Sequence, residues 1–398
     1  MHILTGESSL RALRACRYRG LAVALPEPTP PRRHAFLPGQ ERNDDPDDEA
    51  EITFDSKSLA TSGFDFARVE TNAKVELWRL GDIGAFTRES PLELGVFERR
   101  KTRTRLRSRA RMLSRDLPAD ALVRVDSTLY FVGPELIVLQ MASQRSDVEL
   151  AQIIMELCGS YTPSPVPDNN GKTPCLYKVS PVTTIARIRA YVDRFRQRGG
   201  KQVLHSALGM ALEGAASPAE TNLALAMSLP RSMGGYGLPI SSINASVSAP
   251  DDERDNVGGS SYALDVFWQD AYADLEYESV EFHLDPLAAA SLVAARDEKD
   301  SVDPEVIVWR RERIAKADAD RRRMRDLQYL GLQVIPVTNF DLLSVHRMDQ
   351  VARSLVRRYE QVSKSAMDEW RDALDEKAWR DSRLALLQKL QPGAKILA

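Results

Sequence analysis

The spacing of hydrophobic and polar residues predicts helices and short strands in the first half of the chain. Apolar residues at mostly helical spacing indicate one helix over residues 136–159, and shorter helices are expected over 7–20, 185–198 and 203–212. Residues 123–132 are rich in β-branched and aromatic side chains, which favours a strand. We therefore expect this half to form a smaller α+β domain.

The second half has a different order of expected elements. Ser217 is a suitable N-cap, Pro218 takes the first helical position and Glu220 the third, so a helix begins here. Beyond it, the pattern predicts strands over 243–247, 262–268 and 272–278, a long polar helix over 304–330, a strand over 332–337, and one or two helices over 342–390. The order α-β-β-β-α-β predicts an α/β fold of the mixed α+β kind.

The length of 398 residues exceeds one typical hydrophobic core, so we expect more than one domain. Proline-rich and acidic runs between the first helix and the rest of the chain cannot bury enough apolar surface to order themselves, which predicts a mobile linker. The expected divisions are an N-terminal helix in 1–23, the linker in 24–55, an α+β domain in 56–212, a second domain in 213–345, and C-terminal helices in 346–398 that would suit a protein partner or a homo-oligomer.

The composition narrows the class of protein. The chain is 43% hydrophobic and 28% charged, it lacks an apolar run of the ~18 residues that a membrane span needs, and its N-terminus does not resemble a signal peptide. Three cysteines without paired spacing argue against a disulfide framework or a zinc knuckle, so a cytoplasmic location is expected. Because the net charge is −3, any affinity for nucleic acid must come from local basic patches.

One such patch lies in residues 99–115, which hold nine basic residues and no acidic residue. Arginines alternate with other residues in its central part, and in a strand this period would place them on one face. Such a row suits contact with a phosphate backbone; the alternative is an edge strand whose charges prevent aggregation. The alternating arginines are Arg103, Arg105, Arg107, Arg109 and Arg111.

Two acidic residues form the main candidate site. If Asp270 and Ala271 are the loop residues of a hairpin, Asp265 lies directly opposite Glu276 on the same face of the sheet. Two carboxylates so close repel each other unless a positive charge separates them, and hard oxygen ligands suit Mg²⁺ or Mn²⁺. The alternative is that both acids are solvated on an exposed face.

Two more acids belong to this candidate site. Glu278 points to the same face as Glu276 and would flank the cation, because side chains two residues apart in a strand share a face. Glu220, on the preceding helix, would supply a further metal ligand.

The segment from Ser217 to about Asp341 resembles the PD-(D/E)XK nucleases, in particular the very-short-patch-repair-like branch that includes DUF559 endonuclease-domain proteins. Ser217-Pro218-Ala219-Glu220 resembles the opening helix, Leu264-Asp265-Val266 the metal-binding strand, and Leu275-Glu276-Tyr277-Glu278 the following E-x-D/E segment, with His283 shortly after. Asp320-x-x-Arg323-x-x-x-Leu327-x-x-x-Gly331-x-x-Val334 resembles the closing helix and strand. Together these matches cover about a third of the chain.

The resemblance implies a restriction-endonuclease-like core that hydrolyses phosphodiester bonds with the help of Mg²⁺. Asp265, Glu276 and the Tyr277 carbonyl would hold the metal, and His283 would activate the attacking water. Arg323 would clamp a phosphate oxygen or else pair with Asp320 or Glu278. Glu278 stands where the general signature has a lysine, so that lysine's contribution to the developing charge would be missing.

The first half adds a weaker resemblance. Residues 132–142 resemble the AbiEi-type antitoxin-like region that precedes such nuclease domains in many bacterial proteins, which implies a recognition or regulatory role for this half. The leading expectation is a bacterial endonuclease that acts on DNA. The alternatives are a non-catalytic nucleic-acid-binding regulator on a nuclease scaffold, and a protein-interaction module of a defence or mobile-element system.

Overall fold

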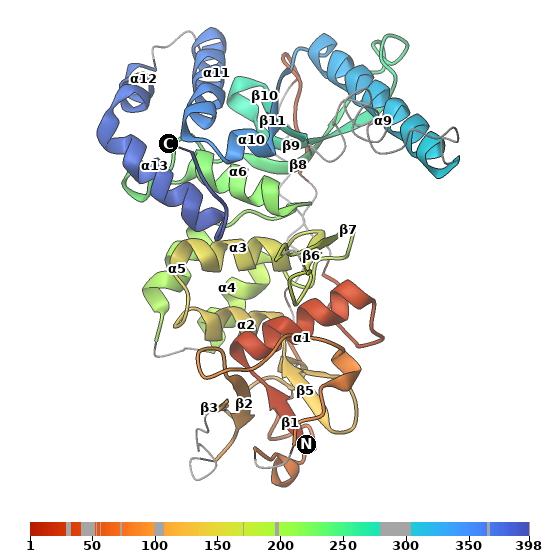
Figure 1. Ribbon diagram of the computed structural model, residues 1–398, viewed down its shortest axis with the longest axis vertical. Coiled ribbons are helices and arrows are strands. Elements are labelled where there is room, and N and C mark those ends of the chain that lie inside the picture. Colours follow the sequence, from red (N-terminus) through yellow and green to blue (C-terminus); the bar gives the residue numbers. More distant parts are fainter. Residues whose placement is uncertain are drawn as a thin grey trace, which may run out of the picture. The chain divides into compact units, whose positions relative to one another are not determined.

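The computed structural model divides the chain into two compact units, each with its own sheet (Figure 1). The first unit comprises Met1–Pro31 and Pro46–Thr221, and the second comprises Arg32–Asp45 and Asn222–Ala398. The structure describes residues 1–28, 33–40, 52, 54–55, 57–71, 74–98, 107–169, 171–195, 199–278, 304–363 and 367–397. No helix within these ranges combines the length and the apolar character that a membrane crossing would need.

A five-stranded sheet forms the base of the first unit. The central strand β1 (His2–Leu4) is antiparallel to β2 (Leu92–Val96) and parallel to β5 (Leu129–Val132). Strand β3 (Ser108–Met112) is the edge next to β2, and β4 (Leu122–Arg124) is the edge next to β5. The N-terminal segment, which we expected to be a separate helix, thus begins with the central strand of this sheet.

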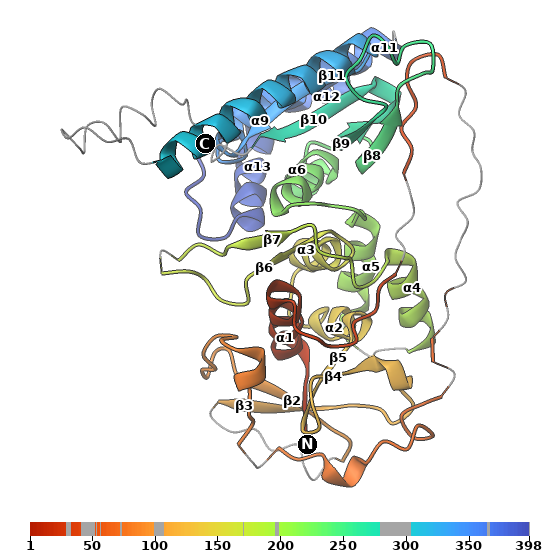
Figure 2. The same cartoon turned by 90° about the vertical axis from the view of Figure 1, so that its right-hand side faces the viewer.

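Five helices and a two-stranded ribbon complete the described part of the first unit. Helix α1 (Gly6–Arg19) packs against the sheet and against α2 (Pro134–Met141) (Figure 2). Its buried residues include Leu10, Leu13 and Cys16. The remaining elements are α3 (Asp147–Leu157), β6 (Tyr161–Pro163), β7 (Cys175–Tyr177), α4 (Ile185–Arg194) and α5 (Lys201–Met210).

Two expectations for this unit were wrong because local polar contacts interrupt the apolar pattern. The strand expected over 123–132 is a hairpin, β4 and β5, whose turn is held by Asp126 accepting a hydrogen bond from the Leu129 amide at 3.0 Å. The helix expected over 136–159 is two helices, α2 and α3, because Ser146 and Glu149 form a capping box that begins a new helix. Side-chain oxygens that bond to nearby amides compete with continuous secondary structure.

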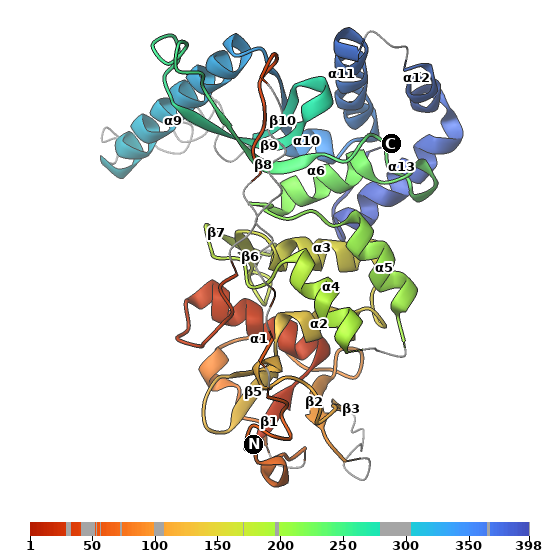
Figure 3. The same ribbon diagram turned by 180° about the vertical axis from the view of Figure 1, so that it is seen from behind.

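The second unit contains the predicted order of elements (Figure 3). Helix α6 (Pro218–Ser228) precedes three antiparallel strands, β8 (Ser242–Ser248), β9 (Ser261–Trp268) and β10 (Ala273–Glu278). Helix α9 (Pro304–Tyr329) then leads to β11 (Gln333–Thr338), which is parallel to β10. The sheet order is β11-β10-β9-β8, so β9 and β10 are its inner strands.

Helices α10 (Asn339–Leu342), α11 (Val345–Ser363), α12 (Asp368–Asp375) and α13 (Lys377–Leu390) end the chain. A buried ion pair joins two of them, since the Arg383 Nε lies 2.9 Å from the Asp349 Oδ1, to which the Tyr236 hydroxyl also donates at 2.8 Å. These contacts place the C-terminal helices in the same unit as the second sheet.

One described part of the expected linker, residues 33–40, is ordered against the second sheet. Ser246 of β8 donates to the Arg33 carbonyl at 2.8 Å and accepts from the Ala35 amide at 2.9 Å. Ala35 and Leu37 are buried in the core of the second unit. The short apolar segment 35–37 therefore orders residues 33–40, which differs from our expectation of a mobile stretch.

Candidate functional site

The β9–β10 hairpin has the register that the sequence predicts. The paired residues are Trp268 with Ala273, Phe267 with Asp274, and Val266 with Leu275. The next step along both strands places Asp265 opposite Glu276. The turn is longer than the expected two residues, because a 3-10 helical turn, Gln269–Ala271, is followed by Tyr272 with a φ of 47°.

Two carboxylates accept hydrogen bonds from backbone amides of the neighbouring strand, at and just beyond the Val266–Leu275 pair of β9 and β10. Asp265 accepts a hydrogen bond from the Tyr277 amide at 2.9 Å, and Asp274 accepts one from the Val266 amide at 3.2 Å. Each side chain thus crosses to the neighbouring strand and fixes its own position there. The site lies on two rigid strands rather than on a loop, which favours a defined geometry.

Asp274 is a member of the site that the sequence analysis missed. It is fully buried, at 0% exposure, whereas Glu276 is 19% exposed. Among the described residues, no donor group bonds to the buried Asp274 Oδ2 or Glu276 Oε2, and the two acids share a hydrogen bond only when one of them is protonated. The alternation of Asp274, Glu276 and Glu278 along one strand was the available signal, because side chains two residues apart share a face.

The buried carboxylates change one another's protonation. Burial raises the pKa of Asp274 well above its usual value, and the charges of Glu276 and Asp265 act in the same direction. The Arg323 guanidinium opposes this rise, whereas a hydrogen bond with Glu276 adds to it. Without a cation, the protonated form of Asp274 is therefore favoured. A buried carboxylate oxygen without a partner raises the free energy of the folded state, so binding of a proton or a cation to these atoms would stabilise the protein.

Arg323 on α9 supplies the positive charge at this site. Its guanidinium forms an ion pair with Glu276 and donates to the Ala263 carbonyl on β9. Burial lowers the pKa of Arg323, but the hydrogen bond to Glu276 and the nearby carboxylate charges outweigh it and raise the pKa overall. We expected Arg323 to clamp a phosphate or to pair with Asp320 or Glu278; the structure pairs it with Glu276.

A second acid on α9 fixes this helix beside β9. The Asp326 Oδ2 accepts hydrogen bonds from the Tyr262 hydroxyl at 2.9 Å and from the Gly258 amide at 3.1 Å. Arg323 lies one helical turn before Asp326, so these contacts also hold the guanidinium at the carboxylates.

The donor atoms suit a divalent cation only in part. Within the described part of the chain, no three His, Cys, Asp or Glu side chains are grouped so that they could hold a metal ion. Mg²⁺, however, is usually held by one or two carboxylates, with waters and substrate phosphates completing its shell. The two oxygens without hydrogen-bond partners, on Asp274 and Glu276, are hard ligands of this kind. The donors therefore fit Mg²⁺ or Mn²⁺ as an incomplete set.

The other predicted site residues lie elsewhere or outside the described residues. Glu220 closes the capping box of α6, since its carboxylate accepts hydrogen bonds from the Ala216 amide and the Ser217 hydroxyl, each at 2.8 Å. Its predicted role as a metal ligand stays a prediction. Glu278 is the last residue of β10, and His283 lies outside the described residues.

The basic patch is only partly described. Arg103 and Arg105 lie outside the described residues, but 108–112 form the edge strand β3, so the described part of the alternating stretch is a strand. Arg107 and Arg109 are exposed. Arg111 instead turns to Glu93, with 3.2 Å between the guanidinium and the carboxylate. Arg107 and Arg109 are thus available for phosphate contact, whereas Arg111 has a structural partner.

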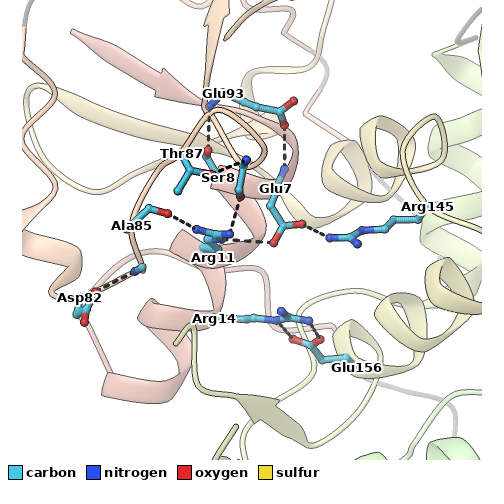
Figure 4. Close-up of polar contacts among 12 residues, drawn as sticks. Glu7, Ser8, Arg11, Arg14, Asp82, Ala85, Thr87, Glu93, Arg145 and Glu156 are labelled. Atoms are coloured by element: carbon cyan, nitrogen blue, oxygen red, sulfur yellow. Dashed lines mark hydrogen bonds and ion pairs between the residues drawn. The ribbon is translucent and has the colours of Figure 1, made fainter. Parts of the chain in front are cut away.

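A second charged cluster, which we call the α1 network, surrounds the first helix of the first unit (Figure 4). Arg14 binds Glu156 through two hydrogen bonds of 3.0 and 2.6 Å, and Arg145 binds Glu7 at 2.7 Å. The Glu93 carboxylate accepts from the Glu7 amide at 3.0 Å, at the positive N-terminal end of α1. Glu7, Glu93 and Glu156 each have a basic partner, since Glu93 pairs with Arg111.

Comparisons with protein-family models, with curated proteins and with solved structures gave no significant match. The chain is a mixed α/β protein. Its function is therefore inferred from the side chains of the β9–β10 site.

Proposed function

We propose that the protein is a metal-dependent endonuclease that hydrolyses phosphodiester bonds in DNA, with a PD-(D/E)XK-like core in its second unit. The observation that carries this proposal is the grouping of Asp265, Asp274 and Glu276 on two neighbouring strands, with a buried oxygen of Asp274 and one of Glu276 lacking a described hydrogen-bond partner. The α-β-β-β-α-β order, with Arg323 arriving from α9, agrees with it.

The residues of the site would have distinct roles. A divalent cation bound here would polarise the phosphodiester and lower the pKa of an attached water. Asp265 and Glu276 would hold the cation, together with the Tyr277 carbonyl that the family resemblance implies. Asp274 lies buried beside Glu276, and the two side chains interact through charge and a hydrogen bond. Glu278, at the end of the same strand, would face the attacking water in the place of the family's lysine.

The first unit would bring DNA to this chemistry. Arg107 and Arg109 present two exposed guanidinium groups at the β3 edge, which suits contact with phosphates but carries no sequence information. We therefore propose that the first unit contributes affinity for DNA but not sequence specificity.

Plasmid cleavage in Mg²⁺ or Mn²⁺ tests the proposal. Substituting a residue that only supports a metal ligand typically lowers metal affinity or activity by about 10- to 100-fold. Substituting a ligand itself should cost at least as much, so Asp265→Asn and Glu276→Gln should each lower the cleavage rate by about 100-fold or more. Asp255→Asn, on an exposed loop of the same unit, is the matched control and should cleave like the wild type. Cleavage that survives Glu276→Gln would reject this site as the source of activity.

One observation favours a second candidate, a nucleic-acid-binding protein without catalysis. Arg323 already pairs with Glu276, and Glu278 replaces the signature lysine, so the fold can keep this site as a scaffold without a catalytic cation. Salt-dependent DNA binding without cleavage at any divalent cation concentration would select this candidate.

A further inference from the structure

We infer that Arg323 is an exchangeable counter-ion of the candidate site, which leaves Glu276 when a divalent cation binds. This inference rests on the site of the proposed function. It concerns metal binding and does not require that the bound protein turns over.

The first support is the position of the guanidinium. Arg323 pairs with Glu276, the residue whose second carboxylate oxygen is buried without a described hydrogen-bond partner. A cation bound to that carboxylate would meet the guanidinium charge at close range, and like charges at such distances repel strongly in a partly desolvated site. The ion pair and the cation therefore compete for one carboxylate.

The second support is the charge balance. Asp265 and Glu276 carry two negative charges, and Asp274 adds a third when it ionises; among the described residues, Arg323 is the base on which all three act. Asp274 is fully buried, where an uncompensated charge is most costly. A guanidinium thus compensates the site incompletely, and a divalent ion would compensate it better. This difference provides a driving force for exchange.

The third support is that Arg323 has a second anchor. Its other terminal nitrogen donates to the Ala263 carbonyl, and one helical turn further on Asp326 holds α9 through Tyr262 and Gly258. The guanidinium can therefore give up Glu276 while α9 keeps its place. Its side chain is 26% exposed, so a released guanidinium can be solvated.

Titration calorimetry with Mn²⁺ alone tests the exchange on the full chain, without DNA. Arg323→Gln removes the competing charge and should tighten Mn²⁺ binding on the order of tenfold. Arg323→Lys keeps the charge and should bind close to the wild-type value. Arg325→Gln is the matched control, because it removes the same charge from an exposed position on the same helix. It should leave the affinity within about twofold of wild type.

Three results would overturn the inference. Mn²⁺ affinity that is equal or weaker in Arg323→Gln would show that Arg323 does not compete with the cation. If neither the wild type nor Arg323→Gln binds Mn²⁺, there is no cation site for which Arg323 could compete. An equal gain in Arg325→Gln would attribute the change to net charge rather than to the Glu276 ion pair.

A second background protects the test against misfolding. Arg323→Gln leaves buried acids without a counter-charge and could unfold the protein for that reason. The same substitution is therefore also made in the Asp274→Asn variant, in which one of these acids is already neutral. The double variant should bind Mn²⁺ more tightly than Asp274→Asn alone, and equal affinities would contradict the exchange. If Arg323→Gln binds Mn²⁺ more tightly than the wild type, but the wild type cleaves no DNA, the exchange is supported and the proposed function is rejected.

Discussion

The α1 network and the β9–β10 site are both clusters of half-buried and buried charges, but their balance differs. In the α1 network, Glu156 pairs with Arg14, Glu7 with Arg145, and Glu93 with Arg111. At the β9–β10 site, three carboxylates act on one guanidinium among the described residues, that of Arg323. The acids of the first cluster are each paired with a base, whereas the second cluster holds more acids than bases in the part of the chain that the structure describes.

This difference separates a structural role from a functional one. Matched pairs fix the positions of helices and strands, because removing one partner leaves the other buried and unpaired. Unmatched acids cost stability, and perturbed groups of this kind gather at functional sites. We therefore expect substitutions in the two clusters to change stability in opposite directions.

The largest effect is expected from Glu156→Ala in the α1 network. Glu156 is 4% exposed and binds Arg14 through both carboxylate oxygens. Breaking a buried ion pair costs about 3–5 kcal/mol, and urea unfolding of the variant should show a loss of this size. Asp193→Ala, at an exposed position of α4, is the control and should change little. A loss of stability below about 1 kcal/mol would contradict the structural role of the α1 network.

Asp274→Asn should act in the opposite direction. Burial and the neighbouring acids raise the pKa of Asp274, so in the folded protein its contribution to stability is present at low pH and is lost as the pH rises through that raised value. With a chelator present, the variant should equal the wild type near pH 4 and exceed it by about 1–2 kcal/mol near pH 8. A difference that does not change between these pH values would contradict this reading of the site.

The exposed arginines of β3 should affect binding rather than stability. Arg107→Gln/Arg109→Gln should weaken DNA binding by roughly tenfold at moderate salt and lower the salt slope by about two, because two phosphate contacts are lost. Fluorescence anisotropy across a salt series measures both quantities. Arg111→Gln is the informative control, since its partner is Glu93, and it should destabilise the fold instead. Unchanged affinity in the double variant would assign β3 to edge protection alone.

The smallest effect is expected at Glu7. Burial raises the pKa of this residue, but Arg145, Arg14 and Arg11 outweigh it and lower the pKa overall. Its contribution is therefore present above the ordinary glutamate value and is lost as the pH falls through the lowered value. Glu7→Gln should cost about 1 kcal/mol at pH 7, because Arg145 is partly exposed, and the difference should close at acidic pH. A cost that persists at pH 3 would show that packing, not charge, accounts for it.

The sequence predicted the second unit better than the first. Strands β8, β9 and β10 and helix α9 lie within two residues of their expected bounds. The strands alternate in polarity and end at turns, and α9 is a long polar segment that begins at a proline and ends before Gly331. In the first unit, β1 has only three residues, too few to show a period. It is the central strand because β2 and β5, which are distant in the sequence, pair with it.

The register of the β9–β10 hairpin, whose next step places Asp265 opposite Glu276, was determined by the sequence itself, because a hairpin is local and its register follows from the alternation of side chains along two adjacent strands. The tertiary structure decided what surrounds that pair. It buried Asp274 completely, and it brought Arg323 from a helix beyond the hairpin to Glu276. Burial and long-range charge contacts depend on how separate elements pack, and local spacing does not encode them.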